Sequence, residues 1–201
     1  MTTLIDYRAD LDGWLATAVD AATWTTALKD AALRLALREY DARLVYETSL
    51  TVTTAGAQQD VSAIDGLDEV LALAYPWQEG ADFAAHTICW RYAGDQTVLV
   101  EEVTPQVGEV IRVRHTRGHT IESLDGAAAT TVPERHRLLI GLAAAAWCCE
   151  LRRRQVSENP AITEDAAQVL AGLAEHFREL FQRGLARAQT GGVLRWAGMG
   201  L

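Results

Sequence analysis

Lysine is nearly absent from this chain of 201 residues, in which Lys29 is the only one. A phosphate-binding P-loop needs a lysine directly after its glycines, and Lys29 lies inside a stretch with helical patterning, so the sequence excludes that kind of nucleotide site. Basic residues are scarce in general, because 18 of them face 27 acidic ones and the formal charge is −9. This balance argues against a protein whose main task is to coat nucleic acid.

Cysteine is also rare, with only Cys89, Cys148 and Cys149 present. An odd number, with two adjacent in a helical run, is not a disulfide framework, and a reducing compartment is its simplest setting. Cys148 and Cys149 lie within an apolar segment, so we interpret both as core residues rather than reactive thiols.

Long apolar runs and targeting segments are missing as well. The longest apolar run covers residues 138–149. This is short of the about 18–20 residues that a bilayer requires, so it predicts a buried helix. The N-terminus has no basic stretch followed by an apolar core, so we expect neither a signal peptide nor contact with a membrane.

Motifs for catalysis and metal binding are the last absence. None of the four serines lies in a Gly-x-Ser-x-Gly turn. His115 and His119 are close in sequence, but no cysteine or third histidine accompanies them, and zinc normally has three or four protein ligands. We therefore predict no catalytic site, no cofactor and no metal. An enzyme would have to assemble distant residues, for instance His115, His119 and Glu101.

Helical periodicity marks the first part of the chain. In residues 26–44, four large side chains recur at spacings of 4, 3 and 4, which places them on one helical face; they are Leu33, Leu37, Tyr40 and Leu44. A shorter helix is predicted before it, around residues 4–21.

The period changes to two at Val45, where β-branched and aromatic residues begin to alternate with polar ones. About six short strands separated by turn signals predict an antiparallel sandwich or small barrel. The last two could form a hairpin around Arg117-Gly118. The candidate strands are residues 45–54, 69–75, 85–92, 97–101, 109–115 and 119–124.

Helical patterning returns after residue 126. Thr131-Val132-Pro133-Glu134 predicts a helix start, because the Thr131 hydroxyl and the Glu134 carboxylate can each accept from the other's amide. That helix runs to about residue 155. A last helix covers residues 163 to about 189 and ends at Thr190-Gly191-Gly192, with an apolar stripe of Ala166, Leu170, Leu173, Phe177 and Leu180.

This order predicts an α+β fold in which the helices of both termini form one bundle and carry an inserted antiparallel β-sandwich or barrel-like domain. The bundle comprises residues 1–44 and 127–190, the inserted domain residues 45–126, and a C-terminal tail residues 191–201. Between residues 55 and 105, nine acidic side chains face only one base, Arg91. We interpret this excess as a solvated acidic face.

Two groups of residues are candidates for binding a partner. Leu194, Trp196 and Met199 lie in the tail, and tryptophan is typical of interface hot spots. The other reading of the tail is that it folds back onto its own domain. Arg152, Arg153 and Arg154 end a predicted helix, where cations suit the helix dipole, or they contact an acidic partner.

Several segments together resemble the head-to-tail adaptor, or connector and head-completion, proteins of tailed bacteriophages, especially the kind in which a β domain is inserted into a helical bundle. The segments are Arg38-Glu39-Tyr40, the following strand into Asp60-Val61-Ser62, Val70 to Tyr75-Pro76-Trp77, Gly108 to His115, and Thr131 to Glu134 before an Ala-rich helix. The resemblance extends over about residues 26–190.

The resemblance implies a homo-oligomeric ring of about twelve copies beneath the portal protein, in the neck of the virion. Such a ring extends the DNA channel toward the tail, and DNA passes through it without sequence-specific binding. It also implies no catalytic site, a C-terminal segment that grips the portal, contact with a tail or neck protein, and assembly in the host cytoplasm.

Two alternatives stay open. The chain could be another neck or tail-completion protein. It could also be a ligand-binding module that uses the acidic β domain, with Tyr75, Trp77 or Tyr92 as a platform for a carbohydrate or a peptide.

Overall fold

The computed structural model describes residues 2–15, 24–94, 96–157 and 164–197, and of residues 157, 164 and 190–197 it describes only the backbone. Within these residues the fold is α+β, with four α-helices and two antiparallel sheets. Helices at both ends flank the strands, so the predicted fold class is confirmed. The chain divides into a helical unit, residues 1–44 with 119–201, and a β unit, residues 45–118.

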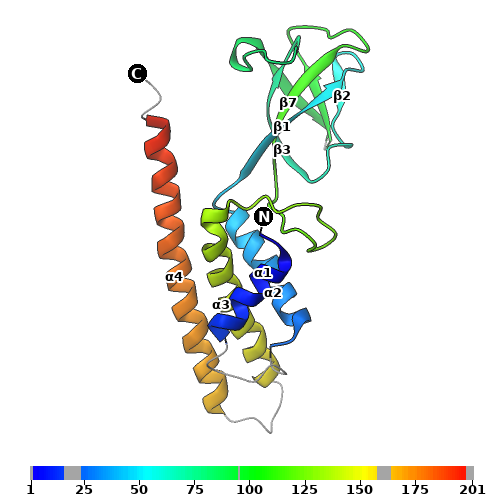
Figure 1. Cartoon of the computed structure of the whole chain (residues 1–201). Helices are drawn as coiled ribbons and strands as arrows, with labels where there is room; N and C mark the ends of the chain where they lie inside the picture. The colour runs from blue at the N-terminus through cyan, green and yellow to red at the C-terminus, as the bar shows by residue number, and fades with distance from the viewer. Residues whose placement is uncertain (1, 16–23, 95, 158–163, 198–201) are drawn as a thin grey trace. The chain divides into compact units, whose positions relative to one another are not determined.

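The helical unit is organised around one central helix, α3. Figure 1 shows α3 between α4 on one side and α1 with α2 on the other, and α3 contacts each of the other three. Residues 143–146, all alanine, and Cys148 with Cys149 are buried along it. Small side chains let the neighbouring helices approach closely. The helices are α1 (Leu4–Leu15), α2 (Thr26–Asp41), α3 (Arg137–Ser157) and α4 (Glu164–Ala197).

Ion pairs hold α1 in place. Arg8 pairs with Asp30 of α2 at 2.6 Å, and Arg137 of α3 pairs with Asp10 at 2.7 Å. Lys29, the single lysine, lies 2.5 Å from Asp12. Its role is therefore structural.

The predicted stripe on α2 is confirmed, because Leu33, Leu37 and Tyr40 are buried and Leu44 packs against the same core. The helix begins after Thr25, whose hydroxyl accepts from the amide of Leu28, an N-cap that satisfies one free N–H group.

The predicted reciprocal cap between Thr131 and Glu134 is wrong. The Thr131 hydroxyl instead accepts from the amide of Thr120, and the Glu134 carboxylate accepts from the hydroxyl of Thr2. A 3-10 turn, Glu134–His136, leads into α3. Both side chains thus make long-range contacts that a local pattern does not contain.

Residues 119–126 were predicted to hold the last strand of the β domain, and this is wrong. They belong to the helical unit, where Ile121 and Leu124 are buried in its core. An isolated bridge joins Glu122 to Thr3. The hairpin expected around Arg117-Gly118 is consequently not formed.

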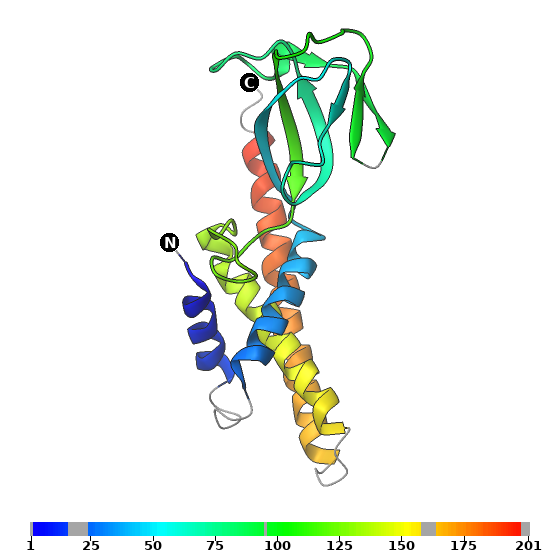
Figure 2. The same cartoon turned by 90° about the vertical axis from the view of Figure 1, so that its right-hand side faces the viewer.

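The β unit contains two sheets that share one core (Figure 2). The larger sheet has the order β1-β7-β3-β4, with β1 Tyr46–Thr53, β7 Val110–Arg117, β3 Leu67–Ala74 and β4 Thr87–Ile88. The smaller sheet has the order β2-β6-β5, with β2 Gln58–Asp60, β6 Thr97–Val100 and β5 Trp90–Gly94. A 3-10 turn, η1 Ala84–His86, precedes β4.

The register of β7 separates apolar from charged side chains. Ile111, Val113 and His115 are buried toward the core that both sheets share, while Arg112 and Arg114 lie on the outer face. His115 is 1% exposed, and its Nδ1 has no hydrogen-bond partner among the described residues. The two-residue alternation therefore places two arginines together on one surface.

Phe181 of α4 is fully buried, whereas its neighbour Leu180, part of the predicted stripe, is only half-buried. We expect Phe181→Ala to lower the free energy of unfolding by about 3–5 kcal/mol, because it leaves a cavity in the core. Leu180→Ala, the matched control, should cost clearly less. Urea denaturation followed by circular dichroism measures both, and equal losses would contradict the orientation of α4.

Burial lowers the pKa of His115 below its usual 6.5, and the nearby charge of Arg117 lowers it further. The unfolded chain then takes up this proton more readily than the folded β unit. We expect the free energy of unfolding to fall as the pH decreases from neutral through about 6.5 toward the lowered pKa.

His115→Leu should flatten this pH dependence, measured as urea midpoints across the same pH series. Ile111→Val, which removes one buried methyl group nearby, should lower stability at every pH and leave the slope unchanged. A slope unaltered in His115→Leu would show that another group titrates.

Candidate functional site

Two of the predicted tail residues, Leu194 and Trp196, fall in the last turns of α4, and Met199 lies outside the described residues. The helix continues through Gly191 and Gly192 to Ala197, so the predicted end near residue 189 is wrong. Each glycine costs a helix about 1 kcal/mol relative to alanine. Because the preceding helix is already formed, these residues only extend it and do not have to nucleate a new one.

The end of α4 extends past α3. Gly184 lies against the side chain of Leu139, the third residue of α3, which runs in the opposite direction. The Gln189 amide donates to the carbonyl of Arg43 at 3.3 Å, just beyond the end of α2. At 1.5 Å per residue, residues 190–197 add about 12 Å of helix beyond this contact.

The arginine cluster at the end of α3 is partly neutralised within its own helix. Arg153 forms a two-bond contact with Glu150, at 2.6 and 3.1 Å, and Arg154 lies 3.7 Å from the same carboxylate. The hydrogen bond from Arg153 lowers the pKa of Glu150. Arg152 donates to Gln155 at 3.2 Å. Glu150 therefore offsets only part of the charge of the three arginines, and the cluster keeps a positive charge.

A polar cluster inside the helical unit joins the end of α2 to residues 119–136. His119 Nδ1 lies 2.6 Å from Asp41 Oδ1, and the Tyr40 hydroxyl lies 2.5 Å from His136 Nδ1. Burial raises the pKa of Tyr40 to about 12 and lowers that of His136. A tyrosine that stays protonated is no nucleophile at neutral pH. The cluster therefore holds α2 against this segment.

The residues named for a distant catalytic constellation are not brought together. His115 is buried within the β unit, whereas His119 belongs to the helical unit, where it pairs with Asp41. Glu101 pairs with Arg91 at 2.9 Å. Among the described residues, no group of three or more His, Cys, Asp or Glu side chains is placed to hold a metal ion.

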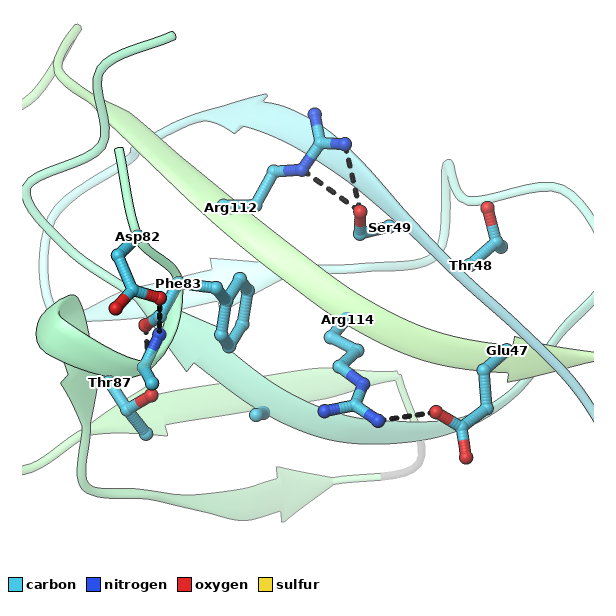
Figure 3. Close-up of a pocket in the computed structure, with 10 residues that line it drawn as sticks. Glu47, Thr48, Ser49, Asp82, Phe83, Thr87, Arg112 and Arg114 are labelled. Atoms are coloured by element: carbon cyan, nitrogen blue, oxygen red, sulfur yellow. Dashed lines mark hydrogen bonds and ion pairs between the residues drawn. The ribbon is translucent and has the colours of Figure 1, made fainter. Parts of the chain in front are cut away.

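The outer face of the larger sheet contains a cavity of about 690 Å³ (Figure 3). Arg112 and Arg114 of β7 lie on one side and Phe83 on the other, and two alanines, Ala72 and Ala84, leave the space between them open. Its volume is in the range of small-ligand sites. The remaining lining residues are Glu47, Thr48, Ser49, Asp82 and Thr87.

Arg112 is held by neutral groups. Its Nε and Nη2 donate to the Ser49 hydroxyl at 3.1 and 2.8 Å, and Nη1 donates to the Thr51 hydroxyl at 3.0 Å. The guanidinium carbon lies 5.6 Å from the centre of the Trp77 ring. Hydroxyls and an aromatic face orient the guanidinium without cancelling its charge. Among the described residues Arg112 has no carboxylate within ion-pair distance, whereas Arg114 pairs with Glu47.

The three aromatic residues proposed as a ligand platform make different contacts. Tyr92 is on β5, and its hydroxyl accepts from the amide of Val70. Tyr75 donates to Glu109, and Trp77 lies beneath Arg112 with its ring 6.0 Å from that of Phe83. Only Trp77 therefore adjoins the cavity face.

The arginine pair was not singled out from the sequence, although its signal was present. Arg112 and Arg114 alternate with buried residues in a segment of period two, which already implies one shared face. The sequence does not show that the hydroxyl partners of Arg112, which are Ser49 and Thr51, lie on β1, 63 and 61 residues away.

The buried cysteines match their interpretation as core residues. Cys148 and Cys149 are fully buried and free, and Cys89 is exposed. Burial raises the pKa of Cys149 to about 11, so its thiol stays protonated at neutral pH. A search for membrane-spanning segments in the described helices finds none with the necessary length and hydropathy.

No family model matches the chain, and a search of curated proteins finds no significant match.

Proposed function

We propose that this protein is a structural assembly component, a head-to-tail adaptor of a tailed bacteriophage. It forms a ring of about twelve copies beneath the portal protein and extends the DNA channel toward the tail. The observation that carries the proposal is the chain order: both ends build one helical unit, and an antiparallel β unit is inserted between Leu44 and His119. This is the architecture that the resemblance implies.

The segments that carry the resemblance support it by their positions. Arg38-Glu39-Tyr40 ends α2 with Tyr40 buried. Val70 lies in β3, Gly108 to His115 leads into and along β7, and Thr131 to Glu134 precedes α3. Each segment therefore marks an element of the fold or a junction between elements.

The charge distribution suits a channel through which DNA slides. The β unit holds 11 of the 27 acidic side chains and 4 of the 18 basic ones, so it carries −7 of the total charge of −9. A lysine-rich wall would retain DNA through phosphate contacts, whereas an acidic one lets it pass.

A ring requires two different contact surfaces on each subunit, one for each neighbour. Large apolar side chains are exposed on three helices of the helical unit: Ile5 on α1, Leu138 on α3 and Val169 on α4. Burial of such side chains between copies supplies the hydrophobic part of an interface.

The portal contact is assigned to the end of α4, where Leu194 and Trp196 lie. Removal of residues 190–201 should leave the fold intact, because Leu185 is the last buried residue in the described part of α4. Portal binding should fall strongly, and Trp196→Ala should lower it in part. Gln168→Ala, an exposed position near the start of α4, is the control. Unfolding of the truncated chain, seen by circular dichroism, would make the segment structural.

The whole assignment is tested by mixing the purified chain with its portal ring. We expect co-sedimentation and an added ring in negative-stain images, with the chain in the virion neck of intact particles. Absence of co-migration at every salt concentration contradicts the adaptor role. Binding to a tail protein but not to the portal would assign the chain to another neck or tail-completion component.

A further inference from the structure

The strand β1 is an edge of the larger sheet, and among the described residues only β7 pairs with it. Its pairing with β7 is regular over eight residues, Tyr46–Thr53. An edge strand of this length, without a bulge, is a template on which another extended chain can add.

The backbone groups that face this free edge can be identified. Thr54 is bonded to the β7 side, because its amide donates to Glu109 and its carbonyl accepts from Gly108. The carbonyl of Val110, the partner of Thr53, accepts from Trp77 on the other side of β7. Since antiparallel pairs alternate, the outward N–H and C=O groups of β1 belong to Glu47, Ser49, Thr51 and Thr53.

The side chains of these same residues lie on the outer face, and the two arginines of β7 reach across to them. Arg112 contacts Ser49 and Thr51, and Arg114 contacts Glu47. Both guanidinium groups therefore lie over β1. A strand added at the edge would run about 4.8 Å from β1, within reach of these groups.

Arg112 has the donors to bind an anion there. Three of its hydrogen bonds go to hydroxyls, and a guanidinium has five N–H groups, so two remain. The contacts with Ser49, Thr51 and Trp77 fix its orientation before a ligand arrives, which lowers the entropy lost on binding. Arg114 already pairs with Glu47, so a second anion would share it.

The spacing of the arginines selects the ligand. Arg112 and Arg114 are two residues apart on a strand, and alternate side chains of an extended peptide have the same separation. Carboxylates at positions i and i+2 of an added strand therefore match both guanidinium groups. The net charge of −7 on the β unit disfavours binding of a polyanion such as DNA. A short acidic segment can still bind, because salt screens the more distant acidic residues over about 8 Å while the two arginines lie close to the ligand.

We propose that the free edge of β1 binds an extended acidic segment of another protein, which adds to the sheet as a strand and places a carboxylate on Arg112 and a second one near Arg114. The backbone of β1 supplies sequence-independent hydrogen bonds, and Arg112 supplies the preference for acid. The proposal does not depend on the adaptor assignment.

The test uses the full chain and a labelled, end-blocked peptide, Thr-Val-Glu-Val-Glu-Val-Thr, with binding followed by fluorescence anisotropy. The peptide with glutamine at both glutamate positions has the same shape without the charge, and it should bind about tenfold more weakly or worse. Arg112→Gln should cause a similar loss, and Arg114→Gln a smaller one. Arg91→Gln, on the other sheet and paired with Glu101, should change nothing.

The edge is tested separately from the charge. The backbone N–H of Thr53 points away from β7, and its side chain contacts neither arginine. Thr53→Pro therefore removes one outward N–H group, and proline is tolerated on edge strands. It should weaken binding while the thermal midpoint stays near that of the parent. No binding of the glutamate peptide, equal binding of its glutamine form, or equal losses in Arg91→Gln and Arg112→Gln would each overturn the proposal. Stronger, Arg112-dependent binding of a short single-stranded oligonucleotide would overturn it in favour of phosphate recognition.

Discussion

The burial of α3 is the constraint on which the helical unit depends. Its alanines at residues 143–146 and its two cysteines are buried and have almost no polar surface. This part of the helix is therefore stable only when other helices cover it. Two of its covers, α1 and α2, precede the β unit, and the third, α4, follows it. Both parts of the chain must therefore meet around α3, and the strands between them become an insertion.

The β unit forms its own hydrophobic core. Val98 and Val100 of the smaller sheet pack with Val70, Ile111 and Val113 of the larger one, and no helix is needed to complete that core. One consequence is that the outer face of the larger sheet does not need apolar side chains to form a core. It can carry charged and hydroxyl side chains, and two of the unit's four arginines, Arg112 and Arg114, lie there.

Periodicity predicted those parts of the fold in which a local pattern coincides with burial. The spacing of Leu33, Leu37 and Tyr40 predicted the buried face of α2, and alternation predicted a strand at residues 109–115, which the structure has as β7, Val110–Arg117. The strand predicted at residues 119–124 is wrong, because this segment bonds to Thr3 and Thr131 rather than to a neighbouring strand, and a local pattern does not contain those partners. The partners of Arg112 on the cavity face could not be predicted for the same reason, since Arg112 meets Ser49 only after the sheet has formed.

Because the two units have separate cores, each proposed contact involves the packing of only one of them. Addition of a strand at β1 uses backbone groups that the β7 ladder leaves unbonded, so it breaks no existing pair and disturbs no residue of the β core. Contacts through the end of α4 involve a different core, centred on Phe181 and Ala144. Because residues in separate cores without shared partners contribute to stability nearly additively, damage to one surface should leave the other measurable. A substitution at one of the two proposed surfaces should therefore leave the packing beneath the other unchanged.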